Sequence, residues 1–191
     1  MKHDVFAKEL EYIKNSKYRK NAEVLIDLLP DYFFEEPASS TGKYHPPFAQ
    51  GEGGLVRHTK VAVRFAHELL NGLIGEPFKD SEKDLMILAL ILHDGIKHGI
   101  PKDRYVKFEH PLLIAKFIKE HQGDTTFTDN EVKFLQNVIS SHMGPFTTNQ
   151  YSNVTLPRPS NKYQKFVHMC DLLASKKFIN VSFDENNIRE D

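Results

Sequence analysis

The sequence predicts an all-α fold, a single-domain helical bundle. Apolar residues recur at spacings of three and four positions through most of the chain, and no stretch shows the strict alternation of a half-buried strand. With 191 residues, of which 40% are hydrophobic, the chain can bury one core and needs no second domain. The continuous apolar run at residues 85–92 predicts the most deeply buried helix of the bundle.

Residues 1–50 are predicted to form N-terminal helices and a loop that pack on the main domain. Helices are expected at residues 5–15 and 21–29. Prolines and glycines then mark a long irregular connection: Pro30, Pro37, Gly42, Pro46, Pro47, Gly51, Gly53 and Gly54. Because loops of this length often have a function, we expect residues 37–54, together with residues 144–159, to wall a site.

Five more helices are predicted in the main domain, residues 51–180. They are expected at residues 55–70, at residues 81–93, from about Pro111, from about Thr128, and from Ser160 to about Lys177. Ser81 is the expected N-cap of the second, with Asp84 three residues on, and residues 128–131 (TDNE) indicate a capping box. Pro111 suits a first helical turn. Residues 181–191 form a polar tail that we expect to fray.

Charge and cysteine content exclude several classes of protein. The formal net charge is -1, so no bulk field would retain a polyanion such as duplex DNA, and a small, locally guided substrate fits better. The single cysteine, Cys170, rules out an intramolecular disulfide and favours a reducing compartment. The first residues, MKHD, show no apolar stretch that would predict a leader, and no apolar run approaches the roughly 20 residues that span a bilayer. We expect a cytoplasmic, soluble protein without membrane association.

Six side chains of metal-binding type fall on predicted inward faces: His58, His93, Asp94, His110, His142 and Asp171. His58, for example, shares a helical stripe with Val61 and Phe65, because positions three, four and seven apart lie on one side of a helix. Buried imidazoles and carboxylates must be neutralised, hydrogen-bonded or bound to a cation. A single inward histidine is usually an ordinary core residue, but this set predicts a metal site within a bundle.

The remaining histidines and the cysteine receive structural interpretations. Surface or loop positions are expected for His3, His45, His67 and His121. His168, one turn before Asp171, is expected to support a ligand or to have no role, and Cys170 to be a small buried hydrophobe. A Ser-His-Asp or Cys-His triad stays open, but no Gly-x-Ser-x-Gly motif supports one.

Five motifs, in order, carry a resemblance to a known family. They are residues 53–59 (GGLVRHT), 93–97 (HDGIK), 110–111 (HP), 141–144 (SHMG) and 171–175 (DLLAS). Together, across about residues 51–177, they resemble the HD-domain metal-dependent phosphohydrolases, which are all-α. The first motif is similar to the HD region of a bacterial 3′-to-5′ exoribonuclease, whose nucleic-acid-binding β-domain has no counterpart here.

The resemblance implies two metal ions. The first would be held by His58, His93, Asp94 and Asp171. His110 and His142 match the subgroup that binds a second ion, and Asp94 would bridge the pair. The chain departs from some two-metal relatives, because residues 141–144 contain one histidine instead of an adjacent pair and no Gly-Tyr-Pro follows. These departures weaken a cyclic-di-GMP assignment.

The ligand set indicates phosphoester chemistry. Divalent Mn, Fe, Mg, Co, Ni or Zn lowers the pKa of bound water, so hydroxide shared by two ions is the expected nucleophile. Asp94 and Lys97 are the predicted catalytic residues, and Lys97 would donate to the phosphoryl group. Lys97, His98 and Arg57 are predicted to bind substrate. Weaker phosphate-binding candidates are Lys102, Arg104, Arg158 and Lys162.

These observations favour a metal-dependent phosphohydrolase that cleaves a phosphoester of a nucleotide or another small phosphorylated substrate. One alternative is a phosphodiesterase or 3′-to-5′ exonuclease acting on single-stranded nucleic acid. Another is a non-catalytic, metal-stabilised domain that binds a nucleotide. The sequence does not decide the oligomeric state.

Overall fold

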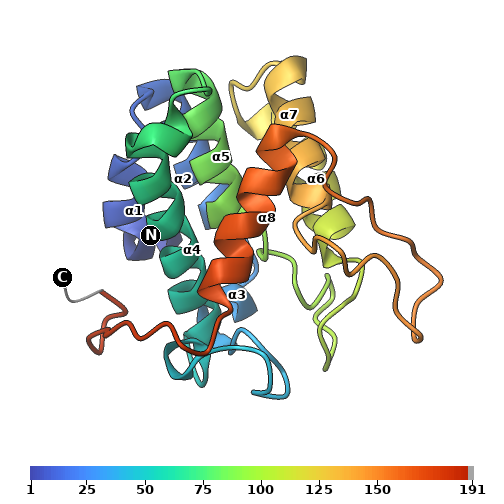
Figure 1. Cartoon of the computed structure of the whole chain (residues 1–191). Coiled ribbons are helices and arrows are strands. Elements are labelled where there is room, and N and C mark those ends of the chain that lie inside the picture. The colour runs from blue at the N-terminus through green and yellow to red at the C-terminus, as the bar shows by residue number, and fades with distance from the viewer. Residues whose placement is uncertain (189–191) are drawn as a thin grey trace.

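The computed structural model describes residues 1–188, and these form an all-helical bundle without a strand (Figure 1). The predicted fold class is therefore confirmed. The α-helices are α1 (Ala7–Glu11), α2 (Ser16–Asp27), α3 (Tyr32–Glu35), α4 (Gly54–Asn71), α5 (Asp80–Leu92), α6 (His110–Glu120), α7 (Asp129–Ser140) and α8 (Lys162–Ala174). Short 3-10 turns lie at Lys2–Phe6, Pro47–Ala49, Leu73–Gly75 and Gln122–Asp124.

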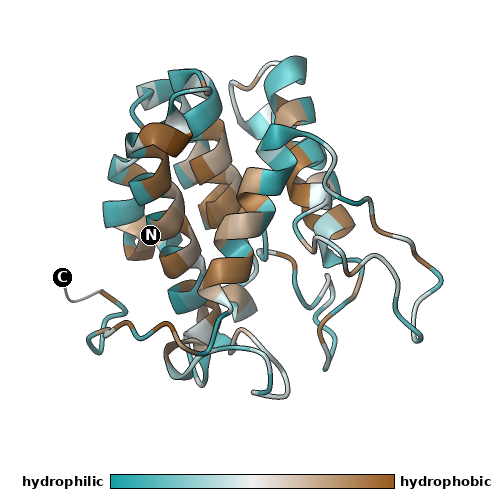
Figure 2. Cartoon of the chain, in the orientation of Figure 1, coloured by the Kyte–Doolittle hydropathy of each residue, from teal (hydrophilic) through white to brown (hydrophobic). Residues whose placement is uncertain are grey.

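Helix α5 is the centre of the bundle, as its apolar sequence predicts. All nine residues from Asp84 onward in this helix are buried, and it packs against α2, α4, α7 and α8. Figure 2 shows apolar residues gathered along α5, with polar residues on the outer turns of the surrounding helices. A helix that is apolar on all sides is stable only when neighbours cover every face, so α5 fixes the arrangement of the others.

The N-terminal helices differ in register from the prediction. A break occurs near Asn15, whose side-chain oxygen accepts from the backbone N–H of Lys17 at 2.9 Å and so caps α2. The predicted helix at residues 5–15 is therefore a 3-10 turn plus the short α1, and α2 begins five residues earlier than expected. Helices α1 and α3 pack against α4, while α2 packs against α5.

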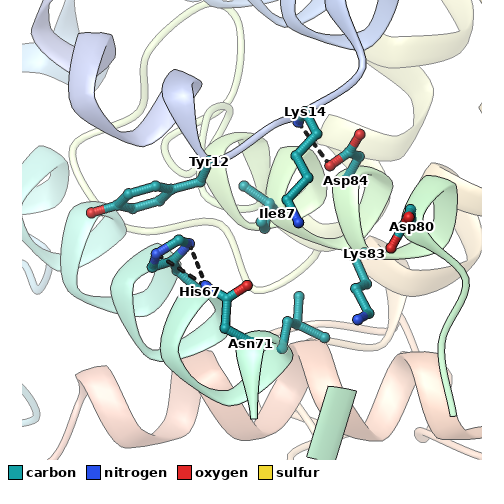
Figure 3. A pocket seen from close by; sticks show the side chains of 9 residues that line it. Tyr12, Lys14, His67, Asn71, Asp80, Lys83, Asp84 and Ile87 are labelled. Atoms are coloured by element: carbon teal, nitrogen blue, oxygen red, sulfur yellow. Dashed lines mark hydrogen bonds between the residues drawn. The ribbon is translucent and has the colours of Figure 1, made fainter. Parts of the chain in front are cut away.

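The N-cap predicted for α5, Ser81, is wrong. Helix α5 begins one residue before Ser81, and the backbone N–H of Lys79 donates to Glu82 at 2.8 Å. Asp84 instead accepts from the backbone N–H groups of Lys14 and Asn15, at 3.0 and 2.8 Å, a contact drawn in part in Figure 3. A buried carboxylate thus satisfies the backbone ahead of α2.

The last helix is capped by Asn161, not Ser160, and it ends at Ala174. The Asn161 side chain accepts from the backbone N–H groups of the second and third residues of α8. The predicted capping box of Thr128 and Glu131 is confirmed at α7.

The tail is not free along its described part. Val181 and Phe183 pack against the core, and Asn187 contacts Arg57. These contacts hold three positions of the predicted tail against the bundle, and residues 189–191 lie outside the described part of the chain.

Candidate metal centre

The six predicted ligands come together around the C-terminal end of α5. His58 lies on the inward face of α4 and His93 directly follows α5; both are fully buried. Asp94 is next in the chain, Asp171 lies on α8, His110 opens α6, and His142 follows α7 by two residues. Segments far apart in the sequence thus bring the set together: His58, His110 and Asp171 lie on helices as predicted, whereas His142 lies just beyond α7 and not on the predicted helical face.

Three of these residues form what we call cluster A: His58, His93 and Asp171. The Asp171 Oδ1 atom lies 3.0 Å from His58 Nε2 and 3.5 Å from His93 Nε2. The Asp171 side chain is 18% exposed, whereas both imidazoles are closed off from solvent. Two imidazoles and a carboxylate at this spacing match the ligand types of a divalent transition metal.

The other three form cluster B: Asp94, His110 and His142. Asp94 Oδ1 lies 3.1 Å from His110 Nε2 and 3.7 Å from His142 Nε2, and the two Nε2 atoms are 3.0 Å apart. The second carboxylate oxygen, Oδ2, turns to cluster A, 3.4 Å from His93 Nε2. Asp94 therefore connects the clusters, with one oxygen toward each.

Backbone carbonyls fix the tautomer of three ligand imidazoles. The Nδ1 atoms of His93, His110 and His142 lie 2.6, 2.7 and 2.8 Å from the carbonyl oxygens of the residues three positions earlier. A carbonyl only accepts, so Nδ1 carries the proton and Nε2 presents a lone pair. This is the outer support that metal-binding histidines usually have.

Buried atoms without partners show that the centre fits a cation. Among the described residues, His93 Nε2 and Asp94 Oδ1 are buried and have no hydrogen-bond partner. His110 and His142 also direct two lone pairs at each other across 3.0 Å. Leaving such groups uncompensated costs about 1–3 kcal/mol each, and a divalent ion would compensate them. Metal binding at these six residues remains a prediction.

The pKa values of both carboxylates in the centre are lowered. Burial raises the pKa of Asp94, but Lys97, His93 and His110 outweigh it and hold the pKa well below its ordinary value. Burial likewise raises the pKa of Asp171, but the nearby His58 and His93 imidazoles outweigh burial and hold this pKa well below its ordinary value. Both carboxylates are thus ionised and available as ligands at neutral pH.

The predicted substrate-binding residues take different positions. The Lys97 ammonium is buried and pairs with Asp94 Oδ2, which places it at the centre. His98 is buried, its Nδ1 donates to the Asp103 carbonyl at 3.1 Å, and its Nε2 has no partner among residues 1–188. Arg57 instead donates to the carbonyls of Phe48 and Gln50, at 2.5 and 2.8 Å, so its guanidinium faces the loop.

His45, predicted to be a surface or loop residue, does lie in the loop before α4, but sequence reasoning missed its contact with the centre. Its ring lies 4.7 Å from that of His58, nearly perpendicular to it, and its Nδ1 is buried without a partner in the described residues. Burial lowers the pKa of His45 to about 3, with His58 and Lys97 acting in the same direction. Only its place in the loop predicted to wall a site could have indicated this, because loops lack periodicity.

His168 supports a ligand, the first of the two roles predicted for it. Its Nδ1 donates to the backbone carbonyl of His142 at 2.6 Å. Gly144 makes this contact possible, since a Cβ there would lie 2.1 Å from the His168 ring. The backbone at Gly144 also has a left-handed φ of 65°.

The other histidines lie away from the centre. His67 is not solvated as expected; it stacks on Tyr12 with ring centroids 3.8 Å apart and lies near Asn71, beside a small pocket between α4 and α5 (Figure 3). His3 and His121 pair with Asp27 and Asp124, each at 2.8 Å. The weaker phosphate candidates face solvent or local partners: Lys102, Arg104, Arg158 and Lys162.

Comparison with known proteins returns no match: no family model, curated protein or solved structure matches this chain. Within residues 1–188, no helix combines the length and apolar character that crossing a bilayer requires. The class that the fold and site define is therefore an all-α bundle with two buried His/Asp clusters able to hold metal ions.

Proposed function

We propose that this protein is a metal-dependent phosphohydrolase of the HD-domain type. The observation that carries the proposal is the pair of buried clusters sharing Asp94, each oxygen of which faces one cluster. Such a pair could hold two divalent ions close together, the arrangement used to bind both the attacking and the leaving oxygen of a phosphoester. The substrate we propose is a nucleotide or another small phosphorylated compound, and the proposed location is cytoplasmic.

The chain's own residues have separate tasks in this reaction. Bound ions would supply Lewis acidity and a water acidic enough to attack phosphorus near neutral pH. The six ligands hold and orient them, and the tautomers set by backbone carbonyls keep the Nε2 lone pairs directed inward. Lys97, held by Asp94 in a buried position, has further N–H donors for a phosphoryl oxygen that gains charge in the transition state.

A cavity beside cluster B supports a substrate larger than phosphate alone. It measures about 670 Å³ and lies between the two long loops that extend from the bundle in Figure 1, lined by Asp103, residues 105–109, Asn149, Tyr151 and Ser152. Volumes of about 300–1,000 Å³ are usual for small-molecule sites. The lining ends at Glu109, which directly precedes the ligand His110. The remainder of a nucleotide could lie here.

A broad phosphoester screen with Mn, Mg, Fe, Co or Ni tests the proposal. We expect turnover of at least one nucleotide, and the double variant His93→Ala, Asp94→Ala should lose bound metal and at least about a thousandfold in rate, roughly 4 kcal/mol. Unchanged turnover in that variant would contradict the proposal. If chelation lowers the Tm while no substrate is hydrolysed, the non-catalytic, metal-stabilised alternative is correct.

One observation favours the second candidate, a phosphodiesterase or 3′-to-5′ exonuclease on single-stranded nucleic acid. Large aromatic side chains are exposed on the loops beside the centre: Tyr105 by 60%, Phe146 by 62% and Tyr151 by 88%. Exposed aromatics are the surfaces on which successive bases stack. Release of mononucleotides from a labelled oligomer, compared with phosphate release from monophosphates and triphosphates, separates the two candidates.

A further inference from the structure

His45 is a half-buried polar residue that the proposed reaction has not yet used. It belongs to the irregular connection between α3 and α4, yet its ring lies nearly perpendicular to that of the ligand His58, with the ring centroids 4.7 Å apart. Its buried Nδ1 has no partner within residues 1–188. The charges that act on its imidazole come from His58, Lys97, Asp94 and Asp171, so His45 lies in the field of cluster A.

Arg57 fixes the loop segment that follows His45. Its guanidinium donates to the carbonyls of Phe48 and Gln50, and it directly precedes His58 on α4. Gly54 allows the loop to approach, because a Cβ there would lie 2.3 Å from the Ala49 carbonyl oxygen. The backbone N–H of Ala38 also donates to that carbonyl at 3.0 Å. The loop is therefore anchored to the same helix that presents His58.

We propose that His45 is a substrate-binding residue whose imidazole N–H donates a hydrogen bond to the phosphoryl group, and that Arg57 positions it. The inference rests on the proposed function and assigns Arg57 an indirect role in place of direct phosphate contact. The three ligand atoms of cluster A lie within 4.8 Å of one another without His45, so the proposal assigns His45 to the substrate and not to a metal ion. Neutral imidazole still carries one N–H, and a phosphoryl oxygen is the acceptor that a phosphohydrolase would place there.

Binding of inorganic phosphate to the Mn-loaded protein tests His45 without requiring turnover. By calorimetry, His45→Ala should weaken phosphate affinity by about tenfold, the effect of one hydrogen bond to a charged group. His45→Asn keeps a donor near the Nδ1 position and should restore most of that affinity. The matched control His121→Ala removes a partly exposed histidine paired with Asp124 and should bind phosphate normally.

A double-mutant cycle tests Arg57. Arg57→Ala should weaken phosphate binding in the native background but have little further effect beside His45→Ala, because its influence passes through His45. Independent, additive losses would show that Arg57 does not act through His45.

Metal content by elemental analysis and the Tm complete the test. Retained metal and fold with weaker phosphate binding support the proposal. Loss of metal in His45→Ala, or unaltered phosphate affinity, overturns it, as does absence of phosphate binding by the native Mn-loaded protein. Phosphate binding that depends on His45 in a protein that hydrolyses no phosphoester would support His45 and reject the hydrolase assignment.

Discussion

Clusters A and B are built from the same types of side chain, histidine and aspartate, but they differ in the number of carboxylates and in the helices that hold them. Cluster A has two imidazoles, the Asp171 carboxylate and one oxygen of Asp94 nearby, and its helices belong to the core. Cluster B has two imidazoles and only the other oxygen of Asp94. We expect cluster A to bind a divalent cation more tightly, because more negative charge faces it. Metal binding at cluster B then depends on Asp94, its only carboxylate, which also faces cluster A.

The largest loss of metal and turnover is expected on substitution of Asp94, because this residue faces both clusters. Asp94→Asn keeps the shape but removes the charge that both clusters use, and it leaves the buried Lys97 ammonium without its carboxylate partner. We expect loss of both ions and a fall in turnover of roughly 10⁴-fold, about 5.5 kcal/mol. Elemental analysis and steady-state rates measure this. Retention of one full equivalent of metal would show that Asp94 does not serve both clusters.

Removing one ligand from each cluster should produce intermediate and unequal effects. Asp171→Asn is expected to empty cluster A and reduce turnover about a thousandfold, while His142→Ala should empty cluster B alone and cost about a hundredfold. The difference follows from the greater negative charge at cluster A. Metal stoichiometry should fall from two to one in each variant. Equal affinities of the two remaining sites would contradict the proposed difference.

A third prediction concerns the support behind cluster B. Gly144→Ala places a methyl group 2.1 Å from the His168 ring and forces a non-glycine residue to a φ of 65°. We expect a loss of about 2–3 kcal/mol in unfolding free energy, measured by urea denaturation, and weaker metal binding at cluster B. The double variant with His168→Ala removes the collision but not the backbone strain, so it should recover part of the stability. Full recovery of the unfolding free energy would indicate that the left-handed backbone at position 144 contributes nothing to the loss.

The sequence predicted the fold and the set of candidate ligands because both depend on helical periodicity. His58 and Asp171, 113 residues apart, could be assigned to inward faces of separate helices, and the structure brings their side chains to 3.0 Å. Helix N-caps were less predictable, because adjacent residues such as Ser160 and Asn161 can both accept a hydrogen bond from the first helical turn. Asp84 could have supported the start of α5, but its buried carboxylate bonds instead to the backbone of Lys14 and Asn15, a contact across about 70 residues.

Features set by the path of a loop could not be predicted. His45 has no periodic context, and its contact with His58 belongs to a loop that Arg57 holds through the carbonyls of Phe48 and Gln50. The same anchoring explains why the guanidinium predicted to face substrate points to the loop. His67 shows the reverse case, since its helical face correctly excluded it from the centre, but only the fold shows that Tyr12 covers it.

The smallest predicted effect is a difference in pH dependence between the clusters. Burial lowers the pKa of His93, but Asp94 and Asp171 outweigh burial and raise the pKa above its ordinary value. Burial, together with His110 and His93, lowers the pKa of His142 to about 3. A cation entering cluster A therefore competes with a proton that His93 binds more tightly than a free imidazole does, whereas at cluster B the His142 imidazole is neutral at any pH well above 3.

Affinity at cluster A should accordingly fall as the pH decreases through and below the raised pKa of His93, by about tenfold per pH unit for one displaced proton. His142 should contribute no pH dependence to affinity at cluster B between pH 7.5 and 5.5, because its pKa is about 3. His142→Ala isolates cluster A and Asp171→Asn isolates cluster B for calorimetry in two buffers of different ionisation enthalpy, which counts the protons released. A steeper pH dependence at cluster B would reverse the electrostatic difference inferred from the buried carboxylates.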